Sequence, residues 1–297
     1  LDGSYDLNRE TYNGELTLSR FPLDRFLTVD SLGSASANFR LEGRYFSWPQ
    51  AKTSVNAGIR QLFYKEHEYK DITLQATLDK THLRGTMVSK DPDAPLDLVF
   101  RGDSLQQQYQ VGLGGYIGKV DLQALHLMQE SLTMGLKVDL QGFIGEHSAY
   151  ALKARFDSLS MADSRKTYTL GSLDIDMASD LKKTTLDVKT GDLQLTFRAD
   201  TSLAGFGESA GKIAGIVGKQ IAGKDIDMEQ IKAELPVFSM HLKGDQNNAI
   251  AKFLKARNMG FRRLSLDIVS RQRSGIRMGI TATAPYFGTV RLDSVQM

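Results

Sequence analysis

Apolar and polar residues alternate along short segments between Lys119 and Asp200, and this pattern constrains the chain more than any other feature. At 136–140, for example, Leu136, Val138 and Leu140 alternate with Lys137 and Asp139. Successive side chains of a strand point to opposite faces, so each segment predicts a strand with one apolar and one polar face. The alternation recurs at 173–177, 186–188 and 193–197, with Gly, Ser and Asp in the connections. The stretch therefore predicts a meander of short antiparallel strands in one sheet.

A second copy of this pattern lies earlier in the chain. An offset of 99 residues pairs Phe39 with Val138, Gly43 with Gly142, and Tyr69 with Tyr168. Repeated whole meanders are typical of an extended protein that grows by adding units. The alternative is that two unrelated amphipathic meanders align by chance. We predict a first β-meander unit at 1–118, a second at 119–202, and a helical insert followed by a third β unit at 203–297.

The pattern changes to helical spacing after residue 203. Phe206, Ile213 and Ile221 lie on one face of a predicted helix, and glycines recur on another side. Such a helix can pack flat on the sheet, or its bare backbone can contact a membrane or plug a groove. A shorter helix is predicted from 225 to 234, and another to 258 with Asn247 or Asn248 as its N-cap and Gly260 as its stop. Three strands, 262–269, 275–281 and 289–295, complete the chain.

Composition excludes several classes of function. The 37 Lys and Arg residues against 35 Asp and Glu give a net charge of +2, so no nucleic-acid partner is expected. The chain has no cysteine, which excludes disulfides and thiolate metal sites. No apolar run is long enough to span a bilayer. Because the first residues already have the sequence of a strand, we interpret the chain as an internal fragment whose anchor lies outside it.

Motifs that carry chemistry are absent from the sequence. The histidines (His67, His82, His126, His147 and His241) occur singly, without the spacing that predicts a zinc site. The glycine-rich segment 112–119 departs from both common phosphate-binding patterns. Asp174 and Asp176 fit the solvated face of a strand better than a pair of catalytic carboxylates. We therefore expect no enzyme, no catalytic residue, no cofactor and no metal site.

Several short stretches together resemble a known family. They are 21–23 (FPL) with 30–33 (DSLG), 41–43 (LEG), 69–76 (YKDITLQA) with 83–86 (LRGT), 120–127 (VDLQALHL), 234–236 (ELP) and 247–254 (NNAIAKFL). This combination resembles the TamB proteins (translocation and assembly module) of the Bacteroidota type, within the AsmA-like, repeating β-groove group.

The resemblance has implications for fold, location and function. It implies a mainly β fold, an extended, curled antiparallel sheet (β-taco), with a few helices near residues 203–258. It also implies a periplasmic segment of a protein anchored in the inner membrane. The roles it implies are carrying phospholipid between the inner and outer membranes and aiding outer-membrane biogenesis. Phospholipid acyl chains, and an outer-membrane Omp85-type barrel protein, are the implied partners.

The residues by themselves raise the same possibility. A single sheet with one apolar face must close on itself, pack on another layer, or bind an apolar ligand. A trough for acyl chains and a β sandwich are the two solutions we consider. The predicted lining residues, which we expect on one concave side, are Phe39, Leu41, Leu74, Leu78, Val138, Leu140, Ile175, Met177, Leu186, Val188, Leu193, Leu195, Phe197, Leu264, Leu266 and Ile268. Their neighbours Arg40, Lys137, Asp139, Asp174, Asp176, Gln194 and Thr196 should face solvent.

Two other hypotheses compete with the lipid groove. The chain could be a scaffold or chaperone that pairs its open strand edges with nascent strands of outer-membrane barrels or secreted autotransporters. It could also be a structural β protein of a surface fibre. Copurified phospholipid would separate the groove from both, and crosslinks from terminal strands to a barrel protein would favour the scaffold.

Overall fold

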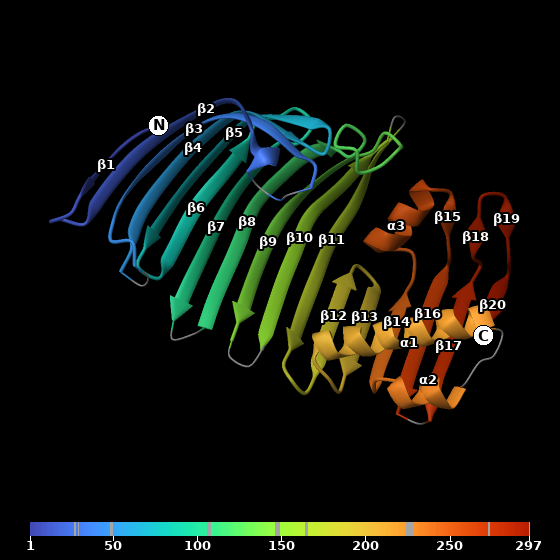
Figure 1. Cartoon of the computed structure of the whole chain (residues 1–297). Coiled ribbons are helices and arrows are strands. Elements are labelled where there is room, and N and C mark those ends of the chain that lie inside the picture. The colour runs from blue at the N-terminus through green and yellow to red at the C-terminus, as the bar shows by residue number, and fades with distance from the viewer. Residues whose placement is uncertain are drawn as a thin grey trace. The chain divides into compact units, whose positions relative to one another are not determined.

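The computed structural model describes residues 1–26, 28, 30–47, 50–105, 108–145, 149–163, 166–223, 228–272 and 274–296. The protein is mainly β (Figure 1). One antiparallel sheet contains 17 strands and is not closed into a barrel, and a small second sheet contains 3 strands. The described α-helices fall between Leu203 and Ala256. The predicted fold class, a large antiparallel sheet with a few helices near 203–258, is therefore confirmed.

Most successive strands up to β13 are joined by short connections. The strands up to residue 121 are β1 (Asp2–Asp6), β2 (Thr11–Pro22), β3 (Leu32–Arg44), β4 (Lys52–Tyr64), β5 (His67–Asp79), β6 (His82–Ser89), β7 (Leu96–Leu105) and β8 (Gln108–Asp121). A 3-10 helix, η1 (Leu23–Arg25), follows β2. The next strands are β9 (Thr133–Ile144), β10 (Tyr150–Ala162), β11 (Thr167–Ser179), β12 (Thr184–Thr190) and β13 (Leu193–Ala199).

The remaining elements combine helices with shorter strands. They are α1 (Leu203–Gly223), α2 (Met228–Glu234), β14 (Phe238–Gly244), α3 (Ala249–Ala256), β15 (Met259–Gly260), β16 (Arg263–Arg271), β17 (Gly275–Thr283), β18 (Tyr286–Phe287), β19 (Val290–Arg291) and β20 (Ser294–Gln296). The continuous strand predicted at 289–295 is wrong, because β19 and β20 are separate and pair with different strands. Residues 225–227, where the second helix was predicted to begin, lie outside the described residues.

The chain divides into two compact units. Unit 1 comprises residues 1–141 and 156–169, and unit 2 comprises 142–155 and 170–297. The division passes through β9, β10 and β11, so each of these strands contributes residues to both units. Each unit is described by itself below.

In unit 1 each strand from β1 to β8 pairs antiparallel with the next along the chain. The register shifts between Leu18 and Phe21, and again between Ser36 and Ala37. Arg20, in the first of these bulges, has a positive φ of 46°, and its N–H donates to Ser36 Oγ over 3.1 Å. A bulge adds twist and bends the strand. The long strands of this unit curve accordingly (Figure 1).

The elements recur at nearly the offset at which the sequence motifs recur. β9 begins 101 residues after β3 (133 − 32), β10 begins 98 after β4 (150 − 52), and β11 begins 100 after β5 (167 − 67). Asp71 in β5 and Gly171 in β11, which are also 100 residues apart, both have positive φ. Three successive strand starts thus recur at an offset of about 100 residues.

In unit 2 the strands β11, β12, β13, β14, β16 and β17 pair antiparallel in that order, and β20 pairs with β17. Helix α1 begins on this sheet, because Phe206 contacts Phe197 and Phe238 edge-on, with ring centroids 5.0 and 5.3 Å apart. Asn248 caps α3 by accepting the N–H of Ala251 over 2.7 Å. The alternative cap, Asn247, is therefore not the one used.

The end of α3 corrects a second expectation. The residue with left-handed backbone is Asn258, with φ 56°, whereas Gly260 belongs to β15 and pairs with Tyr286. Asparagine tolerates this conformation because its short polar side chain can bond locally. None of the helices formed by the described residues is long and apolar enough to cross a membrane.

The protein exposes a large surface for its mass. It exposes 19288 Å², whereas a globular monomer of 32.9 kDa exposes about 12,500 Å². Met161 and Leu193 are the large apolar residues among the most completely buried side chains, and the others in that group are polar. Much of each strand's apolar side therefore lies half-exposed rather than in a closed core.

Candidate functional site

The registers of unit 2 align apolar side chains in rows across the strands. Residues opposite each other on neighbouring strands lie on the same face. One row runs from β11 to β17 as Ile175, Val188, Leu195, Leu242, Leu266 and Ile280. A second row, two residues along each strand, is Met177, Leu186, Phe197, Met240, Ile268 and Met278. Two adjacent rows of apolar side chains therefore cross the same strands on one face, which we call the apolar face of unit 2.

Unit 1 has a comparable face. Phe39 lies opposite Leu16 and Ala57, and the row continues through Leu74, Met87 and Leu98. Leu41 and Leu78 have the same strand parity as Phe39 and Leu74, so they lie on this face, the apolar face of unit 1. On β9, Val138 is 4% exposed while its neighbours Lys137 and Asp139 are exposed.

Most of the predicted lining residues are neither buried nor fully exposed. Val138 and Leu193 are buried, and Leu41 is 39% exposed. The others are half-buried: Phe39, Leu74, Leu78, Leu140, Ile175, Met177, Leu186, Val188, Leu195, Phe197, Leu264, Leu266 and Ile268. In a sandwich the inner residues of both sheets are covered by one another. Half-burial along whole rows shows that the described residues leave these side chains partly accessible.

The opposite face of the sheet carries charges that pair across strands. Arg40 donates to Glu15, and the guanidinium of Arg198 donates to both carboxylate oxygens of Asp187, at 2.8 and 2.7 Å. His241 donates to Asp267 over 2.7 Å, and this hydrogen bond lowers the pKa of Asp267 below its usual value. Such exposed pairs contribute little stability, but they show which face is hydrated.

Asp174 and Asp176 also lie on this polar face. Their carboxylates are within 3.8 Å of Arg155 and 3.5 Å of Lys153 respectively, and both side chains are exposed. Register places them opposite Lys189 and Asp187 rather than together in a cleft. Their position is that of the solvated strand residues that the sequence predicts.

Two shallow hollows lie against the polar side of unit 1. One, of about 470 Å³, is bordered chiefly by Glu15, Asn38, Arg40, Asn56 and Gln75. The other, of about 310 Å³, lies over β7 to β9 and includes Arg101, Lys137 and Asp139. Gly58 borders the first and Gly114 the second, and a Cβ added at either would meet no atom closer than 3.8 Å. Charged residues border both hollows, so acyl chains fit the apolar faces better.

The registers add members that the predicted lining set lacks. In unit 2 these are Met240 and Leu242 on β14 and Met278 and Ile280 on β17. In unit 1 they include Leu16, Met87 and Leu98. The alternation of Phe238, Met240 and Leu242 with polar residues indicates the strand β14 in the sequence. Which strands pair across helical insertions was not visible in the sequence, because pairing is a long-range property.

The structure brings partners to three of the histidines. His82 lies 2.6 Å from Asp103, whose pKa is lowered by hydrogen bonds from Arg84 and His82. His241 pairs with Asp267, and His67 lies close to Asp91 and Asp93. His126 occupies the turn after β8, and His147 lies outside the described residues. No sequence spacing indicated these partners, because each comes from a different strand or loop.

Comparisons with known proteins identify no family for this chain. No protein-family description matches it, and neither a curated protein nor a solved structure does.

Proposed function

We propose that this chain is a periplasmic segment of a bridge-like lipid-transfer protein, and that its apolar faces carry phospholipid acyl chains between the inner and outer membranes. The larger protein, anchored in the inner membrane outside this segment, would take part in outer-membrane biogenesis. The resemblance to the TamB group suggests this role. The observation that carries the proposal is the half-exposed pair of apolar rows across β11 to β17 in unit 2.

An acyl chain suits this surface physically. The two rows lie two residues apart along each strand, about 7 Å, and neighbouring strands are about 4.8 Å apart. A hydrocarbon chain lying along the first row, from Ile175 to Ile280, would contact successive aliphatic side chains without meeting a charge. In the second row, Phe197 is already in contact with Phe206 of α1. Each methylene removed from water contributes about 0.8 kcal/mol. The ion-paired opposite face offers no such contact, so binding should be confined to one side of the sheet.

Photocrosslinking tests which face contacts lipid. Leu242 and His241 are adjacent on β14 but point to opposite faces. A photoreactive amino acid replaces one of them at a time, and the lipid labelling of the two variants is compared. The chain would be expressed in the envelope of a Gram-negative cell with radiolabelled phospholipid. We expect lipid adducts at Leu242 and none above background at His241. Equal labelling at both positions, or none at either, would exclude the apolar face as the lipid path.

A charge placed on the apolar face gives the first mutational prediction. Ile175→Arg should leave the protein folded, because the half-buried site lets the long side chain reach water. It should abolish lipid retention in native mass spectrometry, because an unpaired guanidinium among acyl chains costs several kcal/mol. Leu140→Arg extends the test to β9.

Thr196→Arg is the matched control, because Thr196 lies on the opposite face, across from Asp187 and His241. It should retain lipid at the wild-type level. If Ile175→Arg unfolds the protein in circular dichroism, the face is a closed core and a sandwich is favoured. If it folds and carries lipid normally, Ile175 does not line the path.

A further inference from the structure

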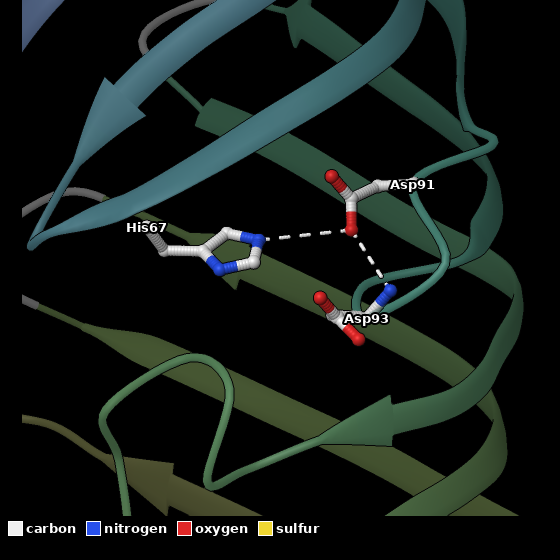
Figure 2. Close-up of side chains that lie close together, drawn as sticks. All are labelled: His67, Asp91 and Asp93. Carbon is white, nitrogen blue, oxygen red and sulfur yellow. Dashed lines mark hydrogen bonds and ion pairs between the residues drawn. The ribbon is translucent and has the colours of Figure 1, made fainter.

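A cluster of side chains that could bind a metal ion lies in unit 1, where the start of β5 meets the loop between β6 and β7. His67, Asp91 and Asp93 each offer a ligand atom, and these atoms lie within 4.8 Å of one another. Figure 2 shows the His67 ring directed at the Asp91 carboxylate, with Asp93 beside it. The three residues come from two segments that are 24 residues apart (91 − 67). This distance explains why no local spacing reveals them.

The hydrogen bond on one side of the ring determines which nitrogen carries the proton. His67 Nδ1 is 3.1 Å from the carbonyl oxygen of Ala124, in the turn after β8. A carbonyl oxygen only accepts hydrogen bonds, so Nδ1 must be the protonated nitrogen. In the neutral ring Nε2 then presents a bare lone pair. A backbone carbonyl on Nδ1 is the usual arrangement for a histidine that binds a metal through Nε2.

That lone pair is buried and lacks a hydrogen-bond partner. Among the described residues, His67 Nε2 is the one buried side-chain nitrogen or oxygen atom without a partner. It faces Asp91 Oδ1 at 3.7 Å, and the side chains of His67 and Asp91 are 11% and 1% exposed. The distance is too long for a direct N–H···O hydrogen bond. Two buried acceptors that face each other repel unless a hydrogen-bond donor or a cation satisfies both.

Asp91 is held in place by the backbone and still has capacity for a ligand. Its Oδ2 accepts the N–H of Lys70 over 2.7 Å. Its Oδ1 accepts the N–H groups of Asp93 and Ala94, at 2.9 and 3.1 Å. A carboxylate offers about four lone-pair sites, and three of them accept these N–H groups, so the free one is on Oδ2. These bonds fix the carboxylate independently of any ion, and the site is therefore preorganised.

From these contacts the geometry points to a binding site for one divalent transition-metal ion of the zinc type, ligated by His67 Nε2, Asp91 and Asp93. The ligand atoms of the three residues lie within 4.8 Å of one another. Zinc binds histidine nitrogen and carboxylate oxygen at about 2.1 Å, so the ligand atoms of a tetrahedral site are about 3.4 Å apart. Asp93 is half-exposed, so its side chain can rotate toward the ion.

The ligand set selects the class of ion. Imidazole nitrogen suits zinc, cobalt, nickel and copper, whereas magnesium and calcium prefer sites made only of oxygen. The ion would join the start of β5 to the loop between β6 and β7. Through Ala124 it would also fix the turn after β8. The ion would therefore stabilise the structure of unit 1. This role does not depend on lipid binding.

Titration of the whole chain with metal salts tests this site. The protein is first treated with chelator and dialysed, and then Zn²⁺, Co²⁺, Mg²⁺ or Ca²⁺ is added in a calorimeter. We expect one equivalent of Zn²⁺ and of Co²⁺ to bind, a higher melting temperature with Zn²⁺, and no comparable binding of Mg²⁺ or Ca²⁺. The bound Co²⁺ should show visible absorption that is distinct from the aqueous ion.

Two variants and a control assign the binding to these residues. His67→Gln and Asp93→Asn should each weaken Zn²⁺ binding by at least about tenfold and remove the rise in melting temperature. His241→Gln is the control, because His241 also lies beside an aspartate but on the exposed face of unit 2. It should bind as the wild type does. Asp93→Asn keeps the Nδ1 bond of His67, so it remains informative if His67→Gln fails to fold.

Three results would overturn the assignment. The wild type could bind no Zn²⁺, which would leave a water molecule to bridge His67 and Asp91. His67→Gln and Asp93→Asn could bind as tightly as the wild type, which would place the metal elsewhere. Stronger binding of Mg²⁺ or Ca²⁺ than of Zn²⁺ would contradict the chemical class. Lipid retention by the same variants is a separate measurement, so failure of one proposal leaves the other standing.

Discussion

Asp192 shows how one residue can join distant segments of this chain. It follows the turn residue Gly191, whose positive φ of 56° and close approach to Asn247 leave no space for a side chain. Its carboxylate accepts the Asn248 side-chain amide and the Asn247 N–H, both over 2.8 Å. In the sequence it is only the end of a Thr-Gly-Asp turn. The structure shows that it also ties the β12–β13 hairpin to the start of α3.

These bonds make the stability of the protein depend on pH. Burial alone would raise the pKa of Asp192, but hydrogen bonds from Asn248, Asn247 and Asp245 outweigh it and lower the pKa below its ordinary value. Because the pKa of Asp192 is lower in the folded protein than in the unfolded chain, ionised Asp192 stabilises the folded state. This stabilisation is fully present above the unfolded-state pKa of about 3.9, and it is lost as the pH falls through the folded-state pKa.

We predict that Asp192→Asn destabilises the protein at pH 6 and that its difference from the wild type shrinks below about pH 4. Urea unfolding at several pH values measures both. Asp139→Asn, at an exposed position on β9, is the control and should show no comparable difference at pH 6. A difference that stayed constant with pH would mean that the charge of Asp192 is not responsible.

At the level of elements, α1 is the segment whose role the sequence left most open. Its first turns pack through Phe206, which contacts Phe197 and Phe238. Its glycines 207, 211, 215 and 218 do not pack, because a Cβ added at any of them would meet nothing within 4 Å. Within the described chain the glycine side of α1 therefore approaches no other backbone. The flat-packing interpretation fits these contacts.

Filling that side should strengthen the helix. We predict that Gly211→Ala and Gly215→Ala each stabilise the protein by up to about 1 kcal/mol, because alanine loses less backbone entropy than glycine on forming a helix. Urea unfolding measures the change, and Gly191→Ala is the opposing control, expected to destabilise. Destabilisation by Gly211→Ala would reveal a close contact at this side of α1.

For the whole molecule, the large exposed area is the property with the broadest consequence. With 19288 Å² exposed, folding buries about a fifth less surface than expected for a globular chain of this mass. The denaturant dependence of the unfolding free energy, the m value, scales with the surface that unfolding exposes. Stability is therefore spread over strand pairing and half-buried side chains rather than a large core.

We predict a urea m value about a fifth below that of a globular protein of equal length. The measurement should be made on lipid-free protein at two concentrations, and both should give the same value. An m value equal to the globular expectation would show that something covers the apolar faces in solution. A value that rises with concentration would identify self-association as the cause.

The sequence by itself determined the faces of the strands whose residues alternate most clearly, although the strand predicted at 289–295 is two separate strands. Alternation at 136–140, 173–177 and 193–197 fixes which side chains share a side of each strand, because the strand period is a local property of the backbone. For the same reason, helical spacing located α1 and a local N-cap located α3. The aligned glycines and tyrosines also indicated that strand starts recur about 100 residues apart.

Only the tertiary structure shows which strands and side chains that are distant in the sequence lie next to each other. The pairing of β14 with β13 and β16 across two helices, and the meeting of His67 with Asp91 and Asp93, depend on loops folding back over tens of residues. Single-sequence periodicity contains no information on such contacts, because loop closure depends only weakly on the residues inside the loop. The apolar rows could therefore be predicted strand by strand, whereas their order across the sheet and the His67 cluster could not.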